Sequence, residues 1–145
     1  MSKLIFINLP VTDLARAKAF YEAIGAVNDP RFTDETGAGM AFSDTIHVML
    51  LTHEKFMNFS PRPIASRDVA QALFCISADD RKAVDDLVEA AGKAGGRPDP
   101  TPADDHGFMY GRSFEDPDGH LWEVMWMDMA AFEAARKAGS AAAAA

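Results

Sequence analysis

The sequence contains a single cysteine, Cys75, among its 145 residues. One cysteine excludes an internal disulfide and a zinc site built from several cysteines. Cys75 lies in the apolar run Leu-Phe-Cys-Ile-Ser, which favours an inert buried thiol over a nucleophile. The fold must therefore be stabilised by its hydrophobic core. A chain of this length buries roughly two thirds of the surface that its unfolded state exposes.

Basic residues are also few. Fourteen Lys and Arg stand against 22 Asp and Glu, which gives a formal net charge of −8. Because the basic residues form no cluster, we expect neither nucleic acid nor an anionic membrane as a partner. No apolar run is long enough to cross a bilayer, and the N-terminus lacks the features of a signal peptide. These absences predict a cytoplasmic protein.

The first half of the chain contains a recognisable order of strands and helices. Apolar residues 4–9 predict a strand that Pro10 ends. An apolar stripe with helical spacing follows over residues 14–24, before a glycine that suits a helix end. Residues 40–42 and 46–51 are apolar segments on either side of Ser-Asp-Thr, and they predict a hairpin.

The same order returns in the second half. Residues 72–77 predict a strand, and residues 84–91 carry an apolar helical stripe that Ser77 or Asp79 can cap. Two further strands, at 108–114 and 121–127, are joined by the turn sequence Asp-Pro-Asp-Gly. A short helix that Phe132 anchors is expected after Asp128. This repetition indicates an internal duplication of one supersecondary unit.

The repeated order predicts one α+β domain with mostly antiparallel sheet. Pro61 and Pro63 favour a connector between the halves and are expected to break any helix there. The alanine-rich end has no apolar periodicity, so we expect it to be disordered. The predicted bounds are 1–138 for the domain, about 3–55 and 71–128 for its two modules, 56–70 for the linker and 139–145 for the tail.

Three sequence motifs identify a family that this chain resembles. Val-Thr-Asp-Leu-Ala-Arg-Ala-Lys-Ala-Phe-Tyr-Glu-Ala-Ile-Gly, at 11–25, resembles the first-helix signature of the vicinal-oxygen-chelate superfamily. Phe-Glu-Asp-Pro-Asp-Gly-His-Leu-Trp-Glu-Val, at 114–124, resembles its last hairpin. The superfamily includes glyoxalase I, bleomycin resistance proteins and extradiol dioxygenases. His-Gly-Phe-Met-Tyr-Gly-Arg-Ser-Phe, at 106–114, resembles a glyoxalase-like subgroup without an assigned reaction. The resemblance implies two tandem βαβββ modules that form a curved sheet around a cleft.

The resemblance also implies where a metal would lie. Enzymes of this family hold one divalent metal with four side chains drawn from His, Glu or Gln, two from each module. Counting from the motifs, the corresponding positions here are Phe6, Leu50, Leu73 and Glu123. Three of these four side chains are apolar and cannot ligate a metal. We therefore expect no catalytic metal and no other cofactor, with a divalent metal bound through other residues as the alternative.

Glu123 is an acidic residue within the mostly apolar strand 121–127. A carboxylate among apolar side chains should be paired, metal-bound or protonated. A hairpin with Gly119 in the left-handed conformation would place Ser113 opposite Glu123 and Arg112 on the other face. A register shifted by one would make Arg112 its ion-pair partner. Glu123 is thus either a structural residue held by Arg112, Tyr110 or a backbone amide, or a carboxylate that binds a cationic ligand or acts as a base.

The predicted cleft is largely apolar, which suits an organic ligand better than a chelated diol. The candidate ligand-binding residues are Phe6, Asn8, Leu50, Leu73, His106, Met109, Tyr110, Ser113 and Glu123. Glu123 is also the candidate catalytic residue. Among the histidines only His106 is a candidate, because it lies at the mouth of the last hairpin, where the proline-rich loop can fold over the cleft. Ordinary core packing explains the apolar members of this set equally well.

We expect a glyoxalase/bleomycin-resistance-like protein that binds a small organic molecule without the usual metal. A homodimer with clefts between the chains fits this expectation, because neither module can bury its sheet alone. One alternative is a metal-dependent lyase or dioxygenase of the glyoxalase type with a relocated site. A second alternative is an interaction module that binds no small ligand.

Overall fold

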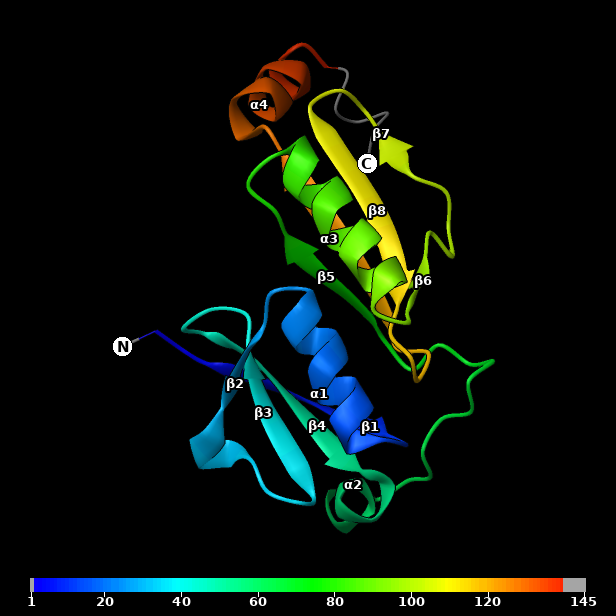
Figure 1. Ribbon diagram of the computed structural model, residues 1–145. Coiled ribbons are helices and arrows are strands. Elements are labelled where there is room, and N and C mark those ends of the chain that lie inside the picture. The colour runs from blue at the N-terminus through cyan, green and yellow to red at the C-terminus, as the bar shows by residue number, and fades with distance from the viewer. Residues whose placement is uncertain (1, 140–145) are drawn as a thin grey trace.

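The computed structural model describes residues 2–139, in which the order of strands and helices repeats (Figure 1). The first module contains β1 (Ile5–Val11), α1 (Leu14–Ala23), β2 (Val27–Asp29), the 3-10 helix η1 (Pro30–Phe32), β3 (Gly37–Ala41) and β4 (Ile46–Thr52), and is followed by α2 (His53–Phe59). The second contains β5 (Leu73–Ser77), α3 (Arg81–Lys93), β6 (Arg97–Pro98), β7 (Asp104–Asp105), β8 (Met109–Glu115) and β9 (Leu121–Met127), and is followed by α4 (Met129–Lys137).

Each module forms its own mixed sheet. The first sheet has the order β1-β4-β3-β2, and the second has the order β5-β9-β8-β6, with β7 also paired to β8. The first strand of each module runs parallel to the last, whereas the other pairs are antiparallel. The α+β fold built from two βαβββ modules is therefore confirmed.

The two long helices begin at aspartate caps. The Asp13 carboxylate accepts a hydrogen bond from the backbone N–H of Arg16 at the start of α1. The cap of α3 is Asp80, which accepts from the N–H of Ala83. The sequence pattern had favoured Ser77 or Asp79 instead. Strand β5 ends at Ser77 as predicted, but a bend at residues 79–80 follows it, so the helix starts only at Arg81.

The connector between the modules contains a helix that the sequence analysis did not predict. Helix α2 covers His53–Phe59, and the Thr52 hydroxyl caps its first turn by accepting from the N–H of Lys55. The prediction that Pro61 and Pro63 exclude a helix here was wrong. These prolines lie beyond the end of α2, so they limit its length without preventing its formation. The first four residues of the predicted linker, 56–59, belong to this helix.

One buried hydrogen-bond network joins the two modules. The Tyr21 hydroxyl on α1 donates to Oδ2 of Asp116 at 2.7 Å, and Nε1 of Trp122 donates to the same hydroxyl at 3.1 Å. All three residues are at most 2% exposed. Burial raises the pKa of both the Asp116 carboxyl and the Tyr21 hydroxyl. The network lies in an aromatic core that Phe20 and Phe114 extend across the same boundary.

The turn that contains Asp116 makes further contacts with the first module. Oδ1 of Asp118 accepts hydrogen bonds from the backbone N–H and the hydroxyl of Thr12, at 2.9 and 2.8 Å. Nε2 of His120 lies 2.7 Å from the carbonyl oxygen of Pro10. Gly119 has a φ of 90°, as the predicted turn geometry requires. The turn 116–120 is therefore both a hairpin connection and the main polar contact between the modules.

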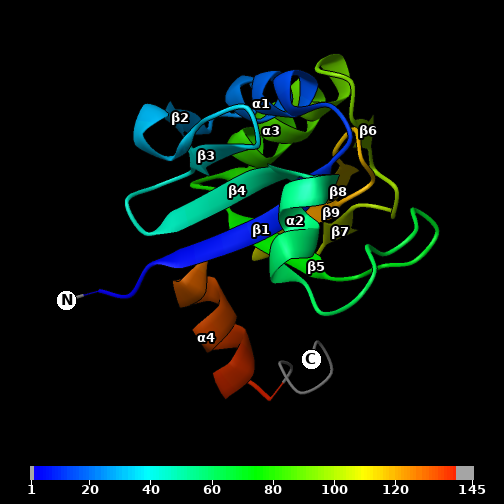
Figure 2. The same cartoon turned by 90° about the horizontal axis from the view of Figure 1, so that it is seen from below.

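The helices are distributed unevenly over the sheets. Helices α1 and α3 lie together on one side, whereas α4 lies on the opposite side (Figure 2). The predicted anchor of α4 is confirmed, since the ring centroids of Phe132 and Phe108 are 5.5 Å apart. Within residues 2–139, no helix is long and apolar enough to cross a membrane. The tail predicted to be disordered is 139–145, and all of it except Gly139 lies outside the described residues.

Candidate functional site

We call the sheet surfaces turned away from α1 and α3 the open faces. In the second module, Trp122 and Val124 are buried toward α3, so Glu123 lies on the open face. Ser113 pairs with Glu123 across the hairpin, which confirms the predicted register. Glu123 is exposed, and no group within residues 2–139 hydrogen bonds or ion pairs with its carboxylate. The carboxylate thus stays hydrated, and the predicted need for a partner does not arise.

Arg112 and Tyr110 of β8 lie on the opposite side of the sheet from Glu123. The Arg112 guanidinium bonds to Asp85 of α3 at 2.9 Å and to Asp99 at 2.7 Å. The Tyr110 hydroxyl donates to Asp85 at 2.6 Å, and this bond raises the pKa of the hydroxyl. Neither side chain therefore holds Glu123. The placement of Tyr110 in the predicted cleft is corrected, because alternate residues of β8 face opposite ways.

In the first module, the predicted placement of Leu50 on the open face is wrong. Phe6 and Asn8 pair with His47 and Met49 on the parallel neighbour β4, so these four side chains share the open face. The rings of Phe6 and His47 stack with centroids 4.8 Å apart. Leu50, predicted for this face, is fully buried on the side of α1. The register chosen from the sequence was shifted by one residue, and such a shift exchanges the two faces of a strand.

The open face of the second module holds a small cavity of about 80 Å³ that brings three candidates together. Met109, Ser113 and Glu123 line it, beside Cys75. The Ser113 hydroxyl lies 2.9 Å from that of Thr101, in the proline-rich loop. An apolar cavity of about 150 Å³ holds one benzene molecule, so this space is too small for a drug-sized ligand.

The remaining candidates lie outside this small cavity. Phe6 and Leu73 are 46% and 64% exposed, and neither lines this cavity. His106 is also exposed, and its Nε2 lies 2.9 Å from Asp104. The structure of the single chain therefore does not gather the predicted ligand-binding residues into one cleft.

The donor set does not fit the divalent metal that the fold family implies. Phe6 and Leu73 occupy two of the corresponding positions, and Met49 is the residue of β4 that faces the same way. Within residues 2–139, no three His, Cys, Asp or Glu side chains form a group that could hold a metal ion. Glu123 is thus the single oxygen donor among the four positions.

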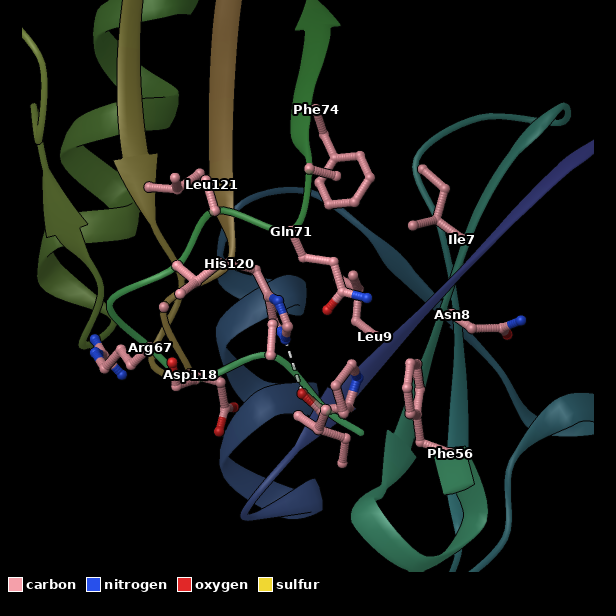
Figure 3. A pocket seen from close by; sticks show the side chains of 18 residues that line it. Ile7, Asn8, Leu9, Phe56, Arg67, Gln71, Phe74, Asp118, His120 and Leu121 are labelled. Carbon is pink, nitrogen blue, oxygen red and sulfur yellow. Dashed lines mark hydrogen bonds between the residues drawn. The ribbon is translucent and has the colours of Figure 1, made fainter. Parts of the chain in front are cut away.

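A larger cavity, of about 280 Å³, lies where the two modules meet (Figure 3). It is bounded by residues 7–10 of β1, by Phe56 of α2, by the loop 64–72, by Phe74 and by residues 118–121. Of the predicted ligand-binding residues only Asn8 lines it. From the sequence, the loop was expected to be a connector, and His120 was not among the candidate residues. This wall of the cavity forms only when segments far apart in the sequence pack together. The apolar residues within 64–74 therefore did not indicate it.

Comparison with known proteins establishes the family. The sequence model of the Glyoxalase/Bleomycin resistance protein/Dioxygenase superfamily matches residues 3–124, and this chain belongs to that superfamily. A comparison with curated proteins finds no match.

Several solved structures have the same fold. A hypothetical protein from S. aureus is 26% identical with a TM-score of 0.72, over 87% of this chain and 95% of that one. A glyoxalase/bleomycin resistance protein/dioxygenase family enzyme from Burkholderia phytofirmans PsJN is 20% identical with a TM-score of 0.70, over 87% and 99%. The fosfomycin resistance protein FosX from Mesorhizobium loti is 18% identical with a TM-score of 0.62, over 87% and 92%. The last two similarities show the fold alone.

The reactivity of Cys75 provides a test of whether Glu123 faces it on the open face. Cys75 is exposed, which corrects the prediction of a buried thiol, and it pairs with Glu123 on the parallel strand β9. Desolvation by the surrounding protein and then the Glu123 carboxylate raise the pKa of this thiol above its usual value.

We predict that Glu123→Gln lowers the pKa of Cys75 and accelerates its alkylation by uncharged iodoacetamide at pH 8. The expected acceleration is about two- to fourfold, the effect of removing one charge roughly 5 Å away in a water-like dielectric. Glu89→Gln, at an exposed site on α3, is the control and should leave the rate unchanged. Equal rates in all three proteins would show that Glu123 does not face Cys75.

Proposed function

We propose that this protein binds a small organic molecule on its open faces without a metal held at Glu123. The observation that carries the proposal is the chemistry of the four positions where related enzymes hold their metal. Phe6, Met49 and Leu73 offer apolar surface there, and Glu123 supplies one solvated carboxylate. Such a composition favours burial of an organic ligand, oriented by a single charged group, over chelation of adjacent oxygens.

The exposure of apolar side chains supports the further proposal of a homodimer with clefts between the chains. Leu4, Ile5 and Phe6 of the first module and Leu73 of the second are all about half exposed or more. Covering apolar surface stabilises an assembly by about 25 cal/mol per Å². A second copy that places its second module over the first module of its partner would cover these residues. It would also close the two open faces around one ligand.

Metal removal and ligand binding together test the proposed function. We predict that the purified protein holds no stoichiometric Mn, Ni or Fe by elemental analysis, and that EDTA leaves its melting temperature unchanged. In a thermal-shift screen of small organic molecules, a ligand at ~100 times its Kd should add about 2.7 kcal/mol of stability.

Glu123→Gln should weaken a cationic hit from this screen, whereas Glu89→Gln should not. One equivalent of metal that is lost in Glu123→Gln would instead support the lyase or dioxygenase alternative. No hit from a broad library, with Glu123→Gln indistinguishable from the native protein, would support an interaction module.

Analytical ultracentrifugation tests the homodimer. We predict a mass of about twice the 15.7 kDa of one chain at micromolar concentration. Phe6→Ser combined with Leu73→Ser should shift the protein toward the monomer, because it removes apolar surface from the proposed interface. Val27→Ser is the control, since Val27 is 69% exposed but lies on the outer strand β2. A native protein that sediments as a monomer at all concentrations would contradict the proposal.

A further inference from the structure

The larger cavity, between the modules, has the size and shape of a separate ligand site. Its volume of about 280 Å³ is nearly twice the roughly 150 Å³ that accommodates benzene, so it has room for one or two fused rings. The phenyl rings of Phe56 and Phe74 lie on two sides of it, and Ile7, Ile64 and Leu121 complete apolar walls (Figure 3). Aromatic faces at two walls favour a flat ligand.

His120 brings a hydrogen-bond acceptor to this cavity. Its Nε2 lies 2.7 Å from the Pro10 carbonyl oxygen, which can only accept, so Nε2 carries the proton of the neutral ring. Nδ1 is then an acceptor, and no group within residues 2–139 donates to it. The Gln71 carboxamide, which also lacks a partner among these residues, projects toward the same space between Phe56 and Phe74 (Figure 3).

The charged residues at the border do not present their charges to the cavity. The Arg67 guanidinium donates to the Pro117 carbonyl oxygen at 2.8 Å and points away from the centre (Figure 3). Oδ1 of the Asp118 carboxylate accepts from Thr12 and lies 3.6 Å from Nη2 of Arg16, and its Oδ2 is buried from solvent without a hydrogen-bond partner among the described residues. An ion in the cavity would lose hydration without a paired charge, so the site favours an uncharged ligand.

We infer that the cavity between the modules binds an uncharged, flat molecule of one or two rings that donates an N–H or O–H to Nδ1 of His120. The ligand lies between the rings of Phe56 and Phe74, beside the Gln71 carboxamide. This site is distinct from the small cavity at Glu123, because no residue of that cavity lines it, and Asn8 is where it borders the open face of the first module.

Methyl NMR titrations with three indoles test this inference. Indole should shift the methyl signals of Ile7, Ile64 and Leu121. 1-Methylindole has no N–H and should bind about three- to tenfold more weakly, the usual effect of one lost neutral hydrogen bond. Indole-3-carboxylate carries a charge and should not bind in the cavity. Equal affinity for indole and 1-methylindole, or indole shifts confined to Met109 and Met125, would overturn the inference.

Two phenylalanines of α2 form a matched pair of variants. Phe56→Ala removes one wall of the cavity and should weaken indole binding by about tenfold. Phe59→Ala alters a residue of the same helix that is 63% exposed and does not line the cavity, so binding should not change. The comparison of the indoles on the native protein stands even if Phe56→Ala unfolds. Glu123→Gln should leave indole binding intact, which separates this site from the proposed function.

Discussion

The buried hydrogen bond between Tyr21 and Asp116 is the interaction on which the arrangement of the two modules depends. Tyr21 belongs to the first helix of the first module and Asp116 to the last hairpin of the second, 95 residues apart. The carboxylate also accepts from the backbone N–H groups of Asp118 and His120, so the same residue shapes the turn and attaches it to α1. Loss of one partner would leave buried polar atoms unpaired, which costs more than the bond itself contributes.

The position of this turn has consequences for both candidate sites. Because the turn places Gly119 in the left-handed conformation, β8 and β9 pair so that Ser113 faces Glu123 and Arg112 faces α3. The same turn holds His120 against Pro10, where its ring forms part of the wall of the larger cavity. One short sequence thus determines which side chains reach the open face and which groups reach the space between the modules.

Local sequence was sufficient to predict much of the fold but only part of the candidate site. The turn chemistry of Asp-Pro-Asp-Gly determined the register of the last hairpin, so Ser113 and Glu123 were placed correctly. No comparable turn determines the register of β4 against β1, and the placement of Leu50 was wrong by one residue. The larger cavity was not predicted because its walls come from segments that meet only after the modules have packed.

This chain differs from related enzymes in the side chains at the four metal-ligand positions, and these positions lie on the open faces. Apolar side chains at Phe6, Met49 and Leu73 leave Glu123 without companions, although the fold that would present four ligands is retained. Members of one fold family often differ in this way, since the chemistry depends on a few side chains and the fold on many. This chain therefore shares the arrangement of the modules with related proteins, whereas their reactions depend on side chains that it lacks.

The free energy of unfolding of Tyr21→Phe, measured by urea denaturation, tests the role of the module contact most directly. The substitution removes one oxygen and leaves Asp116 Oδ2 without its donor and Trp122 Nε1 without its acceptor. We expect a loss of about 1–3 kcal/mol. Tyr110→Phe, which removes a half-buried hydroxyl bonded to Asp85 within the second module, should cost less. An equal or smaller loss for Tyr21→Phe would contradict the account.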